Sequence, residues 1–72
     1  MRYFIFFFKC ESQTSHQSGN IGHYCESMPS VTKVQKIISD RMGKYTPDQS
    51  TIIGFNEVSK DDYCGFFDVE IE

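Results

Sequence analysis

The chain has 72 residues, a length that forms one small domain and buries only about 60% of the surface exposed by the unfolded chain. Its aromatic content of 15% excludes the class of disordered proteins, which are poor in aromatic residues. The net charge of −3 argues against a nucleic-acid partner, because phosphate backbones attract basic surfaces. No apolar run approaches the roughly 20 residues that a membrane-spanning helix needs, so we expect no membrane partner.

Three cysteines, an odd number, argue against a closed disulfide framework and favour a reducing compartment, so we expect a cytoplasmic protein. Arg2 and the six apolar residues after it imitate the start of a signal peptide. Lys9 ends that run early, however, and no small-residue cleavage pattern follows. Acidic residues gather at the end of the chain, where residues 57–72 hold six acids and one base. Such a segment either faces a basic partner or keeps a small protein in solution.

The most apolar segment, Tyr3–Phe8, predicts a β-strand over residues 2–10. Six apolar residues suit a strand and are too few for a buried helix. Because side chains alternate along a strand, both of its faces are apolar, which is typical of a central strand covered on two sides. The two faces consist of Phe4, Phe6 and Phe8 on one side and Tyr3, Ile5 and Phe7 on the other.

Residues 11–20 are almost wholly polar and predict a long loop, and residues 21–26 predict a weaker second strand. If this loop closes an antiparallel hairpin, Phe8 lies near His23 and Phe6 near Cys25.

Residues 30–43 predict the main helix. Ser30 is a suitable N-cap, and Gly43 is a suitable left-handed terminator. The apolar residues between them recur at spacings of three and four and form one stripe. This stripe consists of Val31, Val34, Ile37, Ile38 and Met42.

Residues 51–58 predict a third strand, with Gly54 marking a bulge or a close approach. Ser59 predicts the N-cap of a short helical turn over residues 60–64, followed by a tail over residues 66–72. The fold expected is therefore α+β, with an antiparallel sheet of three or four strands in the order 2-1-3 and one main helix on one face.

Residues capable of chemistry are few. One candidate zinc set consists of Cys10, His16, His23 and Cys25, although its spacing matches no usual zinc motif. No elbow or oxyanion-hole turn surrounds a cysteine, and the adjacent carboxylates Asp61 and Asp62 suit the start of a helix. We therefore expect no enzyme and no cofactor.

The Tyr-Phe-Ile start, the Met-Pro-Ser before the main helix and the segment Ile52–Tyr63 resemble small uncharacterised bacterial and phage proteins. This resemblance implies a bacterial or phage origin and brings no activity or site residues with it.

The leading hypothesis is a non-enzymatic protein–protein interaction module that self-associates as a homodimer. The alternatives are a mobile-element inhibitor of a host factor, acting through the acidic end, and a zinc-stabilised domain. The predicted contact residues are Tyr3, Ile5, Phe7, Phe55, Phe66, Phe67, Asp61 and Asp62.

Overall fold

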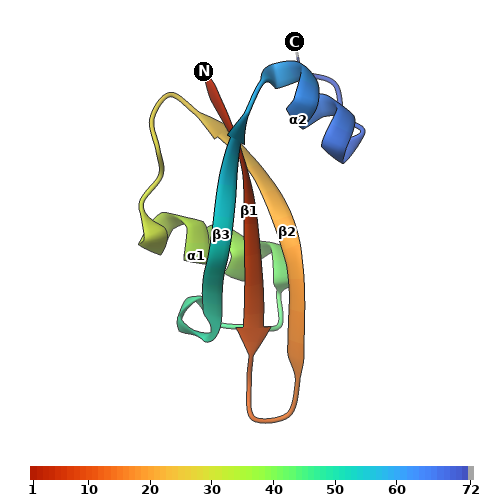
Figure 1. Cartoon of the computed structure of the whole chain (residues 1–72). Coiled ribbons are helices and arrows are strands. Elements are labelled where there is room, and N and C mark those ends of the chain that lie inside the picture. The colour runs from red at the N-terminus through yellow and green to blue at the C-terminus, as the bar shows by residue number, and fades with distance from the viewer. Residues whose placement is uncertain (72) are drawn as a thin grey trace.

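The computed structural model describes residues 1–71 and shows a three-stranded antiparallel sheet with two helices (Figure 1). The strand order β2-β1-β3 confirms the predicted small α+β fold, with β1 in the centre. The elements in chain order are β1 Arg2–Glu11, β2 His16–Cys25, α1 Val31–Met42, the 3-10 turn η1 Pro47–Gln49, β3 Ser50–Val58 and α2 Lys60–Phe67.

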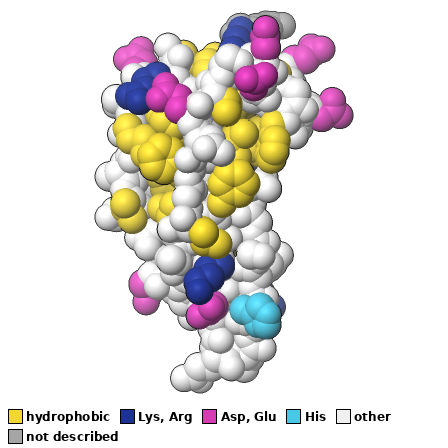
Figure 2. Space-filling view, viewed as in Figure 1, with side chains coloured by type: hydrophobic (Ala, Val, Ile, Leu, Met, Phe, Trp, Pro, Cys, Tyr) yellow, Lys and Arg dark blue, Asp and Glu magenta, His cyan; other side chains and the backbone are white. Residues whose placement is uncertain are grey.

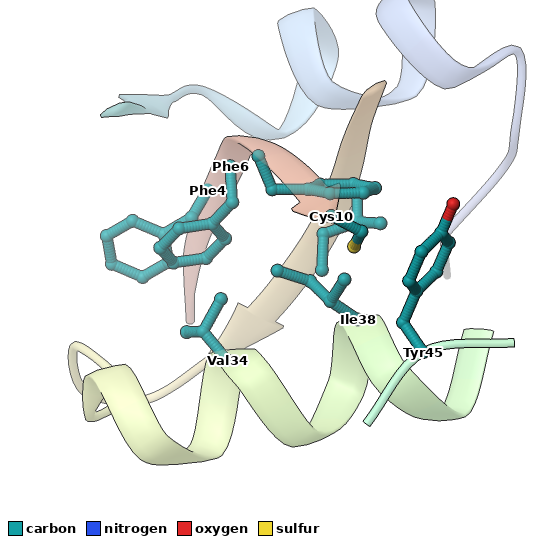
Figure 3. Close-up of a cluster of buried hydrophobic side chains, with 8 residues drawn as sticks. Phe4, Phe6, Cys10, Val34, Ile38 and Tyr45 are labelled. Atoms are coloured by element: carbon teal, nitrogen blue, oxygen red, sulfur yellow. The ribbon is translucent and has the colours of Figure 1, made fainter. Parts of the chain in front are cut away.

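The main core lies between the sheet and α1, which covers one face of β1. Phe4, Phe6 and Phe8 point toward the helix and are almost fully buried against Val34 and Ile38. Figure 3 shows Phe4 and Phe6 of β1 meeting Val34 and Ile38 of α1, with Cys10 and Tyr45 completing the cluster at one end. The alternation of side chains along β1 therefore places its three even-numbered phenylalanines in one core.

The connection between β1 and β2 is much shorter than predicted. Only residues 12–15 turn, so the predicted loop over residues 11–20 and the strand start at residue 21 are wrong. The Ser12 hydroxyl accepts a hydrogen bond from the Ser15 backbone N–H at 3.2 Å, which closes the turn locally. Polar residues 16–20 extend the hairpin because β1 satisfies their backbone groups while their side chains remain exposed.

The shorter turn also changes the register of the hairpin. Phe8 lies opposite Gly19 and Phe6 opposite Ile21, whereas the longer loop had placed them near His23 and Cys25. His23 instead lies opposite Phe4, near the other end of β1. The sequence pattern identified the pair of strands correctly but set their register four residues too far along β2, because turn length fixes the register of a hairpin.

The limits of α1 follow its capping residues, as predicted. The Ser30 hydroxyl accepts a hydrogen bond from the Lys33 backbone N–H at 3.2 Å. Gly43 has a left-handed conformation with φ of 67°, and its N–H donates to the Ser39 carbonyl oxygen. Val34 and Ile38 of the apolar stripe are buried, but Val31 at the start of the helix remains exposed.

The predicted bulge in β3 is present beside Gly54. Phe7 pairs with Gly54 and Phe8 pairs with Ile52, so Ile53 has no partner on β1.

Helix α2 is longer than the predicted turn over residues 60–64. The Ser59 hydroxyl caps it by accepting from the Asp62 N–H, and the helix continues through Gly65 to Phe67. Tyr63 and Phe67 lie one turn apart, and their rings pack at a centroid distance of 4.9 Å. The prediction of a tail over residues 66–72 is therefore wrong for residues 66–67, which belong to the helix. Residues 68–71 form no strand, and residue 72 lies outside the described residues.

Across residues 1–71, neither helix has the length and hydropathy that a membrane-crossing segment requires.

Candidate interaction surface

An apolar groove of about 490 Å³ runs between β3 and the first half of α1. Helix α1 crosses behind the sheet, and the connection before it passes beside β3 (Figure 1), so the groove lies between these segments and the strand. The walls come from the segment before α1, from α1 itself and from β3, while β1 supplies the floor. Its apolar lining consists of Phe6, Met28, Val31, Val34, Ile52 and Phe55.

Two of the polar side chains that line the groove, Gln35 and Ser50, bind backbone carbonyl oxygens. The Gln35 side-chain amide donates to the Ser50 carbonyl oxygen at 3.0 Å, and the buried Ser50 hydroxyl donates to the Pro47 carbonyl oxygen at 2.8 Å. These bonds hold the start of β3 against α1. They also leave the groove mainly apolar, which suits burial of another apolar surface rather than a charged substrate.

Strand β3 forms one edge of the sheet, so the backbone groups on its outer side have no neighbouring strand. Its only charged residue, Glu57, receives two hydrogen bonds from the Arg2 guanidinium, at 2.8 and 3.0 Å. These hydrogen bonds lower the pKa of Glu57, and the same hydrogen bonds raise the pKa of Arg2. The edge therefore carries no uncompensated charge.

Large apolar side chains are exposed beside this edge, together with the polar side chains of Thr51 and Asn56. Ile53 in the bulge is 64% exposed, Phe55 is 49% exposed and Val31 is 65% exposed. Phe55 also contacts the core, with its ring centroid 5.8 Å from that of Phe6. Figure 2 shows the sheet face that lies opposite α1. Apolar side chains gather over its upper part and along its sides, and acidic side chains lie at the end occupied by α2.

The sheet face opposite α1 is covered at one end by α2. The Tyr63 ring packs 5.5 Å from Tyr3 and 5.9 Å from Tyr24, measured between centroids. Ile5 on this face is only 5% exposed. Burial raises the pKa of the Tyr63 hydroxyl. Helix α2 thus covers the end of the second face where β1 begins, and Phe7 farther along remains half-buried.

The structure does not bring the eight predicted contact residues onto one surface. Tyr3, Ile5 and Phe67 pack beneath or within α2, and Phe7 is half-buried on the same face. Phe66 is exposed on α2, while Phe55 lies in the groove on the other side of the sheet. Asp61 and Asp62 are exposed in the first turn of α2, where the helix dipole favours carboxylates.

The four candidate zinc ligands lie in two separate places. Cys10 and His16 are near the turn of the hairpin, whereas His23 and Cys25 are near its open end. The two pairs are separated by about six residues of strand, or roughly 20 Å. Cys10 is buried in the core, and burial raises the pKa of its thiol. Within residues 1–71, no three side chains of metal-binding type form a cluster.

Of the residues that line the groove, only Phe55 belongs to the predicted contact set, and Met28 and Val31 are among those that the sequence did not indicate. Val31 was assigned to the core because it belongs to the apolar stripe of the helix, and Met28 was left in a connection. The start of a helix presents an apolar surface when one apolar residue lies in the connection before it and another lies in its first turn. Whether that surface is covered depends on where β3 lies relative to the start of α1. The periodicity of apolar residues does not predict this position.

No protein-family model matches the chain, and neither the curated proteins nor the solved structures contain a match to it.

Proposed function

We propose that this protein is a non-enzymatic protein–protein interaction module that self-associates through the apolar groove and the edge of β3. The observation that carries the proposal is the continuity of the groove with an open strand edge flanked by Val31, Ile53 and Phe55. Isolated apolar side chains are normal on a protein surface, but a contiguous apolar patch beside a groove is typical of an interaction site.

Two features favour a protein over a small substrate. The polar groups of Gln35 and Ser50 in the groove are engaged with backbone carbonyls, so few remain to orient a small molecule. The side chains with pKa values shifted by burial are Cys10, His23 and Tyr63, and none of them lines the groove. Perturbed titratable groups gather at catalytic sites, so their position elsewhere supports a binding role.

The proposal places the protein in the reducing cytoplasm. All three cysteines are free, and disulfides are rare in that compartment. A bacterial or phage origin stays a prediction from the sequence resemblance.

The test is the mass of the protein in solution, measured by light scattering over a range of concentrations. The wild-type protein is expected to move from monomer toward dimer as its concentration rises. The variants Ile53→Lys and Phe55→Lys are expected to weaken this association at least tenfold, because each places a charge in the apolar contact.

Phe66→Lys is the matched control, since Phe66 is 53% exposed on α2 and lies outside the groove. It should associate as the wild type does. Because Phe55 contacts the core and its loss could affect folding, the Ile53 variant supplies the independent reading. A wild type that stays monomeric at millimolar concentration would refute the proposal.

A further inference from the structure

We propose that a hollow at the junction of β2, α1 and α2 binds a small carboxylate that carries an apolar group. The hollow has a volume of about 340 Å³, which is within the usual range of small-molecule sites. Its lining comes from the middle of β2, from Arg41 in the last turn of α1, and from α2 with the segment after it. It shares no lining residue with the groove beside β3, so this inference does not depend on self-association.

The Tyr63 hydroxyl is a hydrogen-bond donor without a partner. Tyr63 is only 6% exposed, and its hydroxyl forms no hydrogen bond within residues 1–71, whereas the hydroxyl of the buried Tyr45 lies 3.1 Å from that of Ser15. The Tyr63 oxygen lies 2.5 Å from the place that a Cβ on Gly22 would take, and both residues line the hollow. Since buried tyrosine hydroxyls usually have a partner, this one is available to a ligand in the hollow.

Arg41 adds a positive charge to the same hollow. In the part of the chain that the structure describes, its guanidinium forms no ion pair, whereas the guanidinium of Arg2 is held by Glu57. Burial raises the pKa of the Tyr63 hydroxyl, and the charge of Arg41 opposes that rise, which indicates that the cation acts on the hydroxyl. A guanidinium binds a carboxylate through two parallel hydrogen bonds, and the hydroxyl can donate a third.

The charges around the hollow favour a carboxylate over a phosphate. Among residues 1–71, Arg41 is the one cation in the lining, which matches a single negative charge. Asp68 and Glu70 are exposed on either side of Val69, the lining residue that follows α2. Their charges repel a doubly charged anion more strongly than a singly charged one.

The rest of the ligand is apolar because the walls beside these polar groups are apolar. Ile21 on β2 is only 6% exposed, and the half-buried Phe67 packs its ring 4.9 Å from that of Tyr63, measured between centroids. Val69 is 44% exposed and supplies a further apolar side chain. These walls suit a single ring or a short hydrocarbon chain.

The test is a titration of the full chain with phenylacetate, followed by amide NMR spectra. We expect saturable shifts at Asn20, Gly22, Arg41 and Val69, which line the hollow, with a dissociation constant on the order of millimolar. Phenylacetamide lacks the charge, and inorganic phosphate lacks the apolar group. Each is therefore expected to bind about tenfold more weakly or worse.

Two variants identify the groups that hold the carboxylate. Arg41→Gln is expected to weaken phenylacetate binding about tenfold or more, and it should fold because Arg41 is exposed. Tyr63→Phe keeps the ring on the sheet and removes only the hydroxyl, so it should weaken binding about threefold or more. Lys36→Gln is the matched control, because it removes an exposed cation of α1 outside the hollow and should bind as the wild type does.

A second probe distinguishes two sources of the same chemistry. N-acetylglycylphenylalanine carries its carboxylate at the end of a peptide, so tighter binding than that of phenylacetate would identify a peptide C-terminus, and weaker binding would identify a free acid. Phenylacetate shifts that do not saturate, or an affinity unchanged in Arg41→Gln, would overturn the inference. Equal affinity for phosphate or for phenylacetamide would overturn it as well.

Discussion

His23 is a polar side chain held against the apolar core. It lies opposite Phe4 on the face covered by α1, and its Nε2 atom is buried without a hydrogen-bond partner among residues 1–71. Burial lowers the pKa of His23 below its usual 6.5, and the cations Lys33 and Arg41 on α1 lower it further. The folded protein therefore favours the neutral imidazole.

This environment predicts a loss of stability in mild acid. The unfolded chain takes up the proton of His23 at a higher pH than the folded chain, so the free energy of unfolding falls as the pH drops below about 6.5. His23→Leu should lose less stability between pH 7.5 and pH 5.5 than the wild type, as measured by urea denaturation. His16→Gln, at an exposed position near the hairpin turn, is the control and should keep the wild-type dependence. Equal pH dependence in the wild type and His23→Leu would show that His23 is not the group responsible.

Among the elements, α2 depends most on contacts distant in sequence. It has only eight residues, too few to be stable alone, and it remains in place because Tyr63 and Phe67 pack on the sheet. Gly22 of β2 is the residue that allows this approach, because an added Cβ would lie 2.5–2.7 Å from atoms of those two rings. Figure 1 shows α2 at the end of the sheet where β1 begins.

Gly22→Ala is therefore expected to push α2 from the sheet and to cost about 1–3 kcal/mol, the usual range for overpacking. Thermal unfolding followed by circular dichroism measures the loss, and near-ultraviolet signals from the tyrosines should change with it. Gly54→Ala is the matched control, because its Cβ meets only open space and the strand gains from losing a glycine. If the two variants melted at the same temperature, the close packing of α2 on Gly22 would be disproved.

The sequence was most informative where local signals decide the structure. Ser30 and Gly43 predicted the ends of α1, the solid apolar run predicted the central strand, and the connection through α1 predicted the strand order. It failed where long-range pairing decides. Residues 16–20 have polar side chains and no strand signal, yet β1 binds their backbone and extends the hairpin.

The candidate surface was harder to predict than the fold. Phe55 was identified as a contact residue, but it was grouped with Tyr3 and Ile5, which the structure places on the opposite face under α2. Gly54 predicted the bulge, but the exposure of Ile53 and of Val31 depends on how the sheet twists and on where α1 lies relative to β3. Neither quantity is visible in residue periodicity.

In the molecule as a whole, the two helices cover the two faces of the sheet to different extents. Helix α1 covers one face of the sheet but leaves the groove beside β3, and α2 covers one end of the other face. Acidic residues of α2 lie exposed at its first turn, whereas the single carboxylate of β3 is paired with Arg2. A small domain gains stability from burying such an edge, because its own core is limited by its size.

The central claim is that the β3 edge and its groove are the contact surface between copies, and a dilution series of amide NMR spectra tests it most directly. On dilution, the resonances of residues 51–58, Met28 and Val31 are expected to shift together along one binding curve, while those of α2 stay constant. Spectra that do not change with concentration, or shifts confined to α2 and the sheet face beneath it, would contradict the account.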